Sequence, residues 1–411
     1  MSVRKRFGTG IVLIVIAAAA AFGGKPAYRW WQRSRRAAWA AQCRAARDSE
    51  RWVDLQTMAD RWAARDPEVA DPWLFLAEAA QGRHDWPAAA AALVRIPDTD
   101  PKAPAALLAL AQIEFGALNR PLVGEAVCQR LLTLQPRAAP AHQRLIQFYA
   151  ISVQREKLLR QIRFAIDQRC EPPEAYVYLL LLDTLRMSNG VELNEHWLKA
   201  HPNDELFVVG RAIQFPEPHD PIVAPSAPLD VDRKARAGKL KLVETLLEKY
   251  PANLELMAYE IERCTTLGEV NRVAQMLSHA PEAAERDSRF WRFKGWVHEM
   301  LDELPAAETA YKQALEIHPL DWNAWNRLAT VCRRRQDVRE VERLTALVEQ
   351  SRALRIEIRK LPAAELVTPE ILADLASYAR KCGAGWVADA LDSRVGRPDR
   401  WHEPIAPAEC D

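Results

Sequence analysis

The sequence of 411 residues contains little glycine and no closely paired cysteines. Only 15 glycines are present, and no long stretch alternates apolar with polar residues, which argues against a protein built mainly from β-sheet. The seven cysteines are scattered, and no CxxC pair occurs, which excludes a disulfide scaffold and a zinc site of the paired-cysteine kind. We expect these cysteines to pack as small apolar side chains.

Catalytic motifs are also missing from the sequence. It contains no GxxxxGK[ST] phosphate loop, no HExxH, no GxSxG and no GxGxxG after a predicted strand. The nearest two of the nine histidines, His196 and His201, are five residues apart and therefore do not share a helix face. We expect the histidines to lie on the surface. The sequence thus predicts a protein that is not an enzyme, with no catalytic residue, metal ligand, cofactor or small-molecule substrate.

Positive charge is concentrated at the N-terminus. Residues 1–36 contain eight lysines or arginines and no acid, which leaves 48 basic against 55 acidic residues in the remainder. Non-specific binding of nucleic acid needs a basic face that releases counterions. The mildly acidic body of the chain therefore predicts no nucleic-acid partner.

An uncharged stretch of 18 residues occupies positions 7–24. As a helix it would be about 27 Å long, close to the roughly 30 Å hydrocarbon core of a membrane. Trp30 and Trp31 follow it among arginines, as is typical where a span leaves the bilayer. We predict one transmembrane helix that acts as a signal anchor, with the body of a single-pass protein outside the cytoplasm. The alternative is a cleaved secretory signal and a secreted or periplasmic protein, because Ile11 to Phe22 has the length of a signal-peptide core.

Prolines recur at a spacing close to 34 residues, and each closes a run rich in alanine and leucine. They are Pro67, Pro101, Pro136, Pro172 and, later, Pro319. A fixed period of about this length is typical of a helical repeat. Because one unit cannot bury its own apolar face, neighbouring units must stack into a superhelix, and its concave side is then available to a partner.

The clearest unit begins at Ser288 and reads SRFWRFKGWVHEMLDELPAAETAYKQALEIHP. It resembles the tetratricopeptide repeat, and the matching residues are Trp291, Gly295, Ala307, Tyr311, Ala314, Leu315 and Pro319. Weaker matches place Trp39, Trp73 and Trp325 at the position of Trp291. The resemblance implies an all-α protein, a right-handed superhelical solenoid of antiparallel helix pairs, in which the small residues let the two helices of a pair approach closely.

The pattern predicts six segments. They are a tail, span and basic aromatic flank over 1–35; N-terminal repeats over 36–203; a repeat with a proline-rich insertion (215–232) over 204–251; C-terminal repeats over 252–366, with the best unit at 288–321; a capping helix pair over 367–395; and a disordered tail over 396–411. We expect the insertion to be extended, and the second helix of its repeat to resume near Ala235.

The resemblance also implies a partner groove, lined by one face of the first helix in each pair. In the two clearest units this face carries Arg289, Arg292, Trp296, Asn323, Asn326 and Arg333. Arginine forks and asparagine amides suit a peptide backbone or a carboxylate, and Trp296 offers an apolar anchor. The N-terminal units offer a more apolar surface, which suits a helix or an extended peptide: Leu74, Glu78, Leu108, Gln112 and Phe115.

These features predict a bacterial-type, membrane-anchored, non-catalytic scaffold or adaptor that binds a protein or peptide segment in its groove. The alternative is an accessory or substrate-recruiting subunit of an envelope enzyme or assembly complex. The repeats occupy almost the whole chain and leave no block long enough for a separate catalytic domain, which favours the scaffold.

Overall fold

The computed structural model describes residues 30–187, 189–215 and 229–395. All regular secondary structure in these residues is helical, which confirms the predicted all-α class. The predicted membrane segment (7–24), residues 216–228 of the predicted insertion and the predicted tail (396–411) lie outside the described residues. Among the helices of the described part, none combines the length and the apolar character that a membrane span requires.

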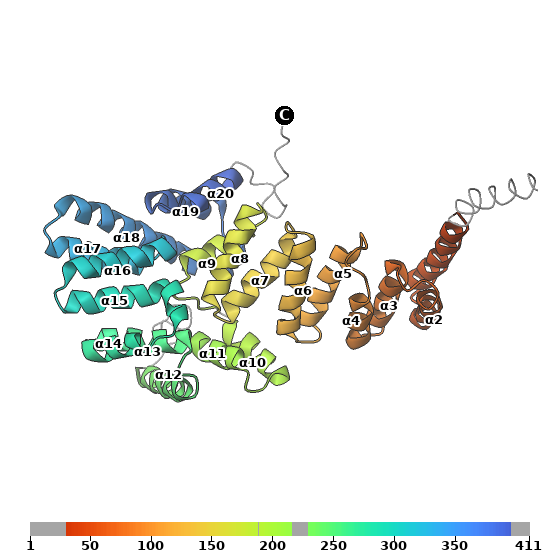
Figure 1. Ribbon diagram of the computed structural model, residues 1–411, viewed down its shortest axis with the longest axis horizontal. Coiled ribbons are helices and arrows are strands. Elements are labelled where there is room, and N and C mark those ends of the chain that lie inside the picture. The colour runs from red at the N-terminus through yellow and green to blue at the C-terminus, as the bar shows by residue number, and fades with distance from the viewer. Residues whose placement is uncertain (1–29, 188, 216–228, 396–411) are drawn as a thin grey trace, which may run out of the picture. The chain divides into compact units, whose positions relative to one another are not determined.

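The chain divides into two compact units, of which the first comprises residues up to Leu118. Its helices pack against their neighbours in chain order, as hairpins (Figure 1). Leu55, Trp62 and Phe75 form part of its core. The helices are residues 30–48, α2 (Trp52–Ala63), α3 (Ala70–Gly82), α4 (Trp86–Val94) and α5 (Ala103–Phe115).

The second unit begins at Asn119. Most of its consecutive helices also pack as hairpins. They are α6 (Pro121–Leu134), α7 (Ala139–Ile151), α8 (Arg155–Asp167), α9 (Glu174–Leu180), α10 (Gly190–Ala200), α11 (Glu205–Gln214), α12 (Leu229–Lys249), α13 (Leu254–Leu267), α14 (Val270–Ser278), the short η1 (Glu282–Arg286), α15 (Ser288–Met300), α16 (Leu304–Ile317), α17 (Trp322–Arg334), α18 (Val338–Arg359), the short η2 (Ala364–Leu366), α19 (Pro369–Lys381) and α20 (Gly385–Val395).

Gly295 shows why the repeat needs a small residue in its first helix. A Cβ atom at this position of α15 would lie 2.6 Å from Cε1 of Tyr311 on α16. The Tyr311 ring is fully buried, and its hydroxyl donates to Glu299 over 2.7 Å. Ala307 and Ala314 of α16 are also fully buried. Small side chains therefore let α15 and α16 approach as closely as the sequence pattern predicted.

The tryptophans at the position of Trp291 link consecutive units by a hydrogen bond as well as by packing. In three of the four cases the indole N–H donates to the backbone carbonyl six residues earlier, in the turn between hairpins. The bonds run from Trp73 to Pro67 (2.9 Å), from Trp291 to Glu285 (3.0 Å) and from Trp325 to Pro319 (2.8 Å). Trp39 is half-buried and packs against the core of the first unit.

His142 occupies the same position in the hairpin of α7 and α8. Its Nε2 atom lies 2.8 Å from the Pro136 carbonyl, and its Nδ1 atom lies 2.6 Å from Nε2 of Gln161. Because a carbonyl only accepts, Nε2 carries the proton and Nδ1 accepts from the amide. Burial lowers the pKa of His142, so this neutral form is favoured. The expectation that histidines lie on the surface is wrong here, because a buried ring with two hydrogen bonds replaces the indole.

The helix after the proline-rich insertion begins earlier than predicted. We expected it to resume near Ala235, but α12 begins at Leu229. Residues 229–232 are therefore helical rather than extended. The physical reason is that no proline follows Pro228 until Pro251, and the intervening residues are rich in lysine, arginine, leucine and alanine, which favour helix.

The C-terminal helices of the second unit contact its earlier helices, although the two are far apart in the sequence. Gln147 of α7 donates to Glu365 of η2 over 3.1 Å, and Arg394 of α20 forms a buried ion pair with Glu171, just before α9. In Figure 1, α8 and α9 accordingly lie near α18 and α20. Every residue of α9 is buried. The second unit thus folds around a segment of its own chain.

Candidate partner groove

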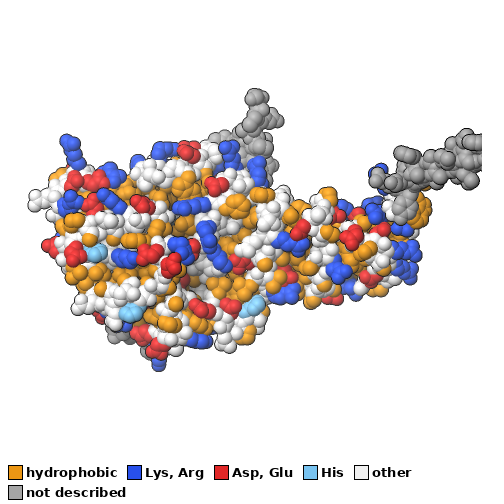
Figure 2. Space-filling model, viewed as in Figure 1, with side chains coloured by type: hydrophobic (Ala, Val, Ile, Leu, Met, Phe, Trp, Pro, Cys, Tyr) orange, Lys and Arg blue, Asp and Glu red, His pale blue; other side chains and the backbone are white. Residues whose placement is uncertain are grey.

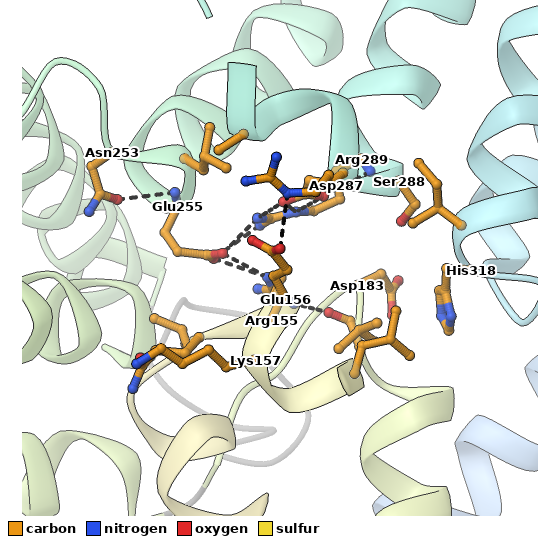
Figure 3. Close-up of a pocket in the computed structure, with 18 of the residues that line it drawn as sticks. Arg155, Glu156, Lys157, Asp183, Asn253, Glu255, Asp287, Ser288, Arg289 and His318 are labelled. Carbon is orange, nitrogen blue, oxygen red and sulfur yellow. Dashed lines mark hydrogen bonds and ion pairs between the residues drawn. The ribbon is translucent and has the colours of Figure 1, made fainter. Parts of the chain in front are cut away.

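A cavity of about 260 Å³ lies inside the second unit. The N-terminal ends of α8, α13 and α15 meet there, with α11 and the turn after α16 completing the wall (Figure 3). Four basic and four acidic side chains line it, so their formal charges cancel. Its apolar lining comes mainly from Leu182, Leu206, Val209, Leu254 and Ile317.

Glu255 lies between two arginines at this cavity. It accepts from Nε of Arg155 over 3.0 Å and from Nη2 of Arg289 over 2.6 Å (Figure 3). Arg289 also donates to Asp287 over 2.6 Å, and Asp287 caps α15 by accepting from the Arg289 backbone N–H. Burial alone would raise the pKa of Asp287, but the neighbouring Arg289 outweighs it and holds that pKa below its usual range. The cluster is therefore a set of satisfied ion pairs.

A second cavity, of about 220 Å³, shares four lining residues with the first: Arg155, Asp183, Glu255 and Arg289. It is also lined by Arg292 and Asn323. Arg292 is buried and pairs with Asp321 and Glu262, each over 3.2 Å. The cavity thus gathers three of the six predicted groove residues, but both arginines already hold carboxylates of the same chain.

Asp183 lies where side chains of α17 and α18 converge. It accepts from Arg355 of α18 over 2.9 Å, from the Trp322 indole over 3.2 Å and from the Asn323 amide over 3.3 Å. The side chains of Asp183 and Arg355 are only 4% and 6% exposed. Burial raises the pKa of Asp183, but attraction to Arg355 outweighs it, so the net pKa lies below the ordinary value.

Backbone carbonyls beside Asp183 are also held by side chains. Arg355 donates to the Leu180 carbonyl over 2.8 Å, and Arg155 donates to the carbonyls of Leu182 and Thr184. Residues 181–184 form hydrogen-bonded turns after α9, in which the N–H groups of Thr184 and Leu185 donate to the Leu181 carbonyl. The carbonyls of Leu182 and Thr184 accept from Arg155 instead. Side chains of α8, α17 and α18 thus hold this segment of the chain through one carboxylate and three carbonyls.

The remaining predicted groove residues lie elsewhere. Trp296 is 4% exposed and belongs to the core that contains Ile261 and Phe293, so the apolar anchor that we expected there is not accessible. The reason is that α13 and α14 pack against this face of α15. Asn326 and Arg333 are exposed and line neither cavity.

Sequence reasoning missed Arg155, Asp183, Glu255, Arg355 and His318. They lie far apart in the chain, and only the return of the C-terminal helices brings them together. His318 is 2% exposed, contrary to the expected surface position, and burial lowers its pKa. One signal was available for Arg355, because its helix α18 has 22 residues and extends beyond the length of a repeat helix.

Acidic and basic side chains are intermixed over the visible face of each unit (Figure 2). In the part of the chain that the structure describes, no group of three or more His, Cys, Asp or Glu side chains could hold a metal ion. The six cysteines of this part are buried free thiols, as their expected packing role requires.

Comparison with known proteins found no matching family model and no matching curated protein. Among solved structures, a tetratricopeptide repeat protein from Parabacteroides merdae is 13% identical, with a TM-score of 0.29; the match covers 64% of this chain and 98% of that one. Yeast Tom70 is 12% identical, with a TM-score of 0.27 and coverage of 89% and 77%. The human IFIT1 dimer with m7Gppp-AAAA is 11% identical, with a TM-score of 0.33 and coverage of 86% and 88%. These comparisons assign neither a family nor a partner to the chain.

Proposed function

We propose that this protein is a non-catalytic scaffold of tetratricopeptide type that binds a peptide segment of another protein. The proposal rests on the hydrogen bonds and the ion pair that other helices of the second unit form with residues 180–184. Side chains of α8, α17 and α18 hold a turn segment there by its carbonyls and by one carboxylate. The same donor types suit a segment of a partner.

The surface for an external partner lies in the first unit, on α3 and α5. Leu74, Leu108 and Phe115 are partly exposed there, and Gln112 is exposed. One carboxylate oxygen of Glu78 is buried without a hydrogen-bond donor, and burial raises the pKa of this group. That oxygen is not accessible to a partner, and the other Glu78 oxygen pairs with Arg47 over 3.8 Å. An N–H group of a bound segment would donate to the exposed Gln112 amide oxygen, while its apolar side chains would pack against the leucines. We therefore propose a partner segment with apolar side chains and an N–H donor.

Site-specific photo-crosslinking tests this surface. A photoreactive residue at Gln112 should form an adduct with one polypeptide in cells, and the same residue at the exposed Glu316 of the second unit should not. The double variant Leu74→Glu, Leu108→Glu should abolish the adduct, because two carboxylates would enter the apolar contact. An adduct that forms equally at both positions, or that survives the double variant, contradicts the proposal.

We also propose that residues 7–24 anchor the scaffold in a membrane, with its repeats outside the cytoplasm. The support is the uncharged length of this segment and the two tryptophans that follow it. Carbonate extraction and N-terminal mapping test this. Full-length protein should remain in the membrane, with protease reaching the repeats from outside the cytoplasm. A shortened, soluble protein would instead identify a cleaved signal.

A further inference from the structure

We infer that residues 180–187 are an internal ligand of the surface formed by Arg155, Asn323 and Arg355, called here the C-terminal groove, and that an external peptide with an aspartate in the same turn can take their place. This inference rests on the proposed peptide-binding function. It adds a second binding surface, which the chain itself keeps occupied.

The polar contacts have the form of peptide recognition. Their donors come from three helices, α8, α17 and α18, and all of them reach one short irregular segment. The carbonyls of Leu180, Leu182 and Thr184 are features that any peptide offers when it forms the same turn. The carboxylate of Asp183 is the specific feature, because three donors converge on it. The groove therefore selects an acidic residue between backbone carbonyls.

Two leucines supply the apolar part of this recognition. Leu182 is 6% exposed and Leu185 is 1% exposed. Leu185 lines a third cavity, of about 120 Å³, together with Ile358 and Leu361 from the end of α18 and the chain after it. The segment thus places an apolar side chain on each side of its aspartate, and a competing peptide would need the same order of side chains.

The backbone of Leu185 is strained in the internal segment. Its φ of 40° lies in the left-handed region, which a leucine rarely adopts. Leu185 lies in the connection that ties the end of α9 at Leu180 to the start of α10 at Gly190. A free peptide carries no such tether and can relax. The tether compensates by keeping the internal segment at a high effective concentration.

These opposing effects predict a groove that is closed in the wild-type chain and that opens when the internal segment is weakened. Leu185→Ala weakens the segment and leaves every groove donor in place. The matched control is Leu267→Ala, the same substitution at a side chain that is 58% exposed. Asp183→Asn is a second variant, which removes the internal carboxylate and leaves Arg355 free to bind another.

Fluorescence anisotropy with the full chain tests the inference. The probe is a labelled peptide of residues 180–187, LLLDTLRM, and the control peptide has asparagine in place of its aspartate. Leu185→Ala and Asp183→Asn should each bind the aspartate peptide at least tenfold more tightly than the wild type and the Leu267→Ala control. The asparagine peptide should bind at least tenfold more weakly to both variants.

A folded Leu185→Ala or Asp183→Asn chain that binds the aspartate peptide no better than the wild type would overturn the inference. If neither variant folds, hydrogen exchange on the wild-type chain decides. Amides of residues 181–187 should exchange faster with millimolar aspartate peptide than with the asparagine peptide, and equal exchange would overturn the inference. Crosslinking at Gln112 depends on the first unit, so the proposed function and this inference can fail separately.

Discussion

Replacing Gly295 by alanine tests the close approach of α15 and α16. The added Cβ would lie 2.6 Å from Cε1 and 2.7 Å from Cδ1 of Tyr311, whereas carbon atoms prefer a separation of about 3.5–4.0 Å. The ring cannot move away easily. It is fully buried, and its hydroxyl is held by Glu299, which is itself buried. The overlap must therefore push the two helices apart.

Two effects of opposite sign determine the expected loss of stability. Alanine is favoured over glycine inside a helix by about 0.5–1 kcal/mol. Overpacking a filled core costs about 1–3 kcal/mol, and a ring held at both faces and at its hydroxyl should lie near the upper end of that range. We expect Gly295→Ala to lower the free energy of unfolding by about 2 kcal/mol, the difference between these effects.

Urea denaturation followed by far-ultraviolet circular dichroism measures this change. The control is Gly238→Ala in α12, where the glycine is exposed and nothing lies within 4 Å of the new Cβ. Only the helix preference acts there, so the control should gain about 0.5–1 kcal/mol. If Gly295→Ala were as stable as the wild type while Gly238→Ala behaved as expected, the close contact with Tyr311 would be refuted.

Three further predictions concern stability. Trp291→Phe removes the indole donor to the Glu285 carbonyl and should cost about 0.5–1.5 kcal/mol in urea denaturation, whereas no loss would show that the bond is unimportant. Arg394→Met leaves the buried Glu171 carboxylate without its cationic partner and should lower the free energy of unfolding by about 3–5 kcal/mol. Adding Glu171→Gln should recover most of this loss, and no recovery would contradict the ion pair. Burial lowers the pKa of His318 from 6.5, so this residue binds a proton more readily in the unfolded chain than in the folded one. Its contribution to the stability of the fold is therefore complete above pH 6.5 and is lost as the pH falls below that value. His318→Gln should reduce the fall in thermal midpoint between pH 7.5 and 5.5, and an unchanged fall would exclude His318 as its cause.

The hairpins of the C-terminal repeats could be predicted because their determinants are local. Gly295 and Tyr311 are 16 residues apart, and both face the contact within one pair of helices. The proline at the end of a unit stops the helix before it, wherever the unit lies in the chain. The indole of Trp291 then reaches a carbonyl only six residues earlier. Spacing alone is enough to place such contacts.

The surroundings of the proposed groove residues could be predicted only in part. The rule that positions along a helix fix which side chains share a face places Arg289, Arg292 and Asn323 on one surface, and all three line one cavity. It failed for Trp296, which neighbouring helices cover. No local pattern shows that a side chain on an exposed-looking face will be buried by helices that are distant in the sequence.

The sequence by itself determined the helical class, the period of the repeat and the small-residue contacts within a hairpin, because these depend on residues about one repeat apart. Only the tertiary structure decided that Arg355 and Asn323 contact Asp183. Asp183 and Arg355 are separated by 172 residues, and their contact depends on the sum of small rotations between many stacked helices. The return of α18 to α9 is therefore a property of the whole second unit rather than of any one repeat.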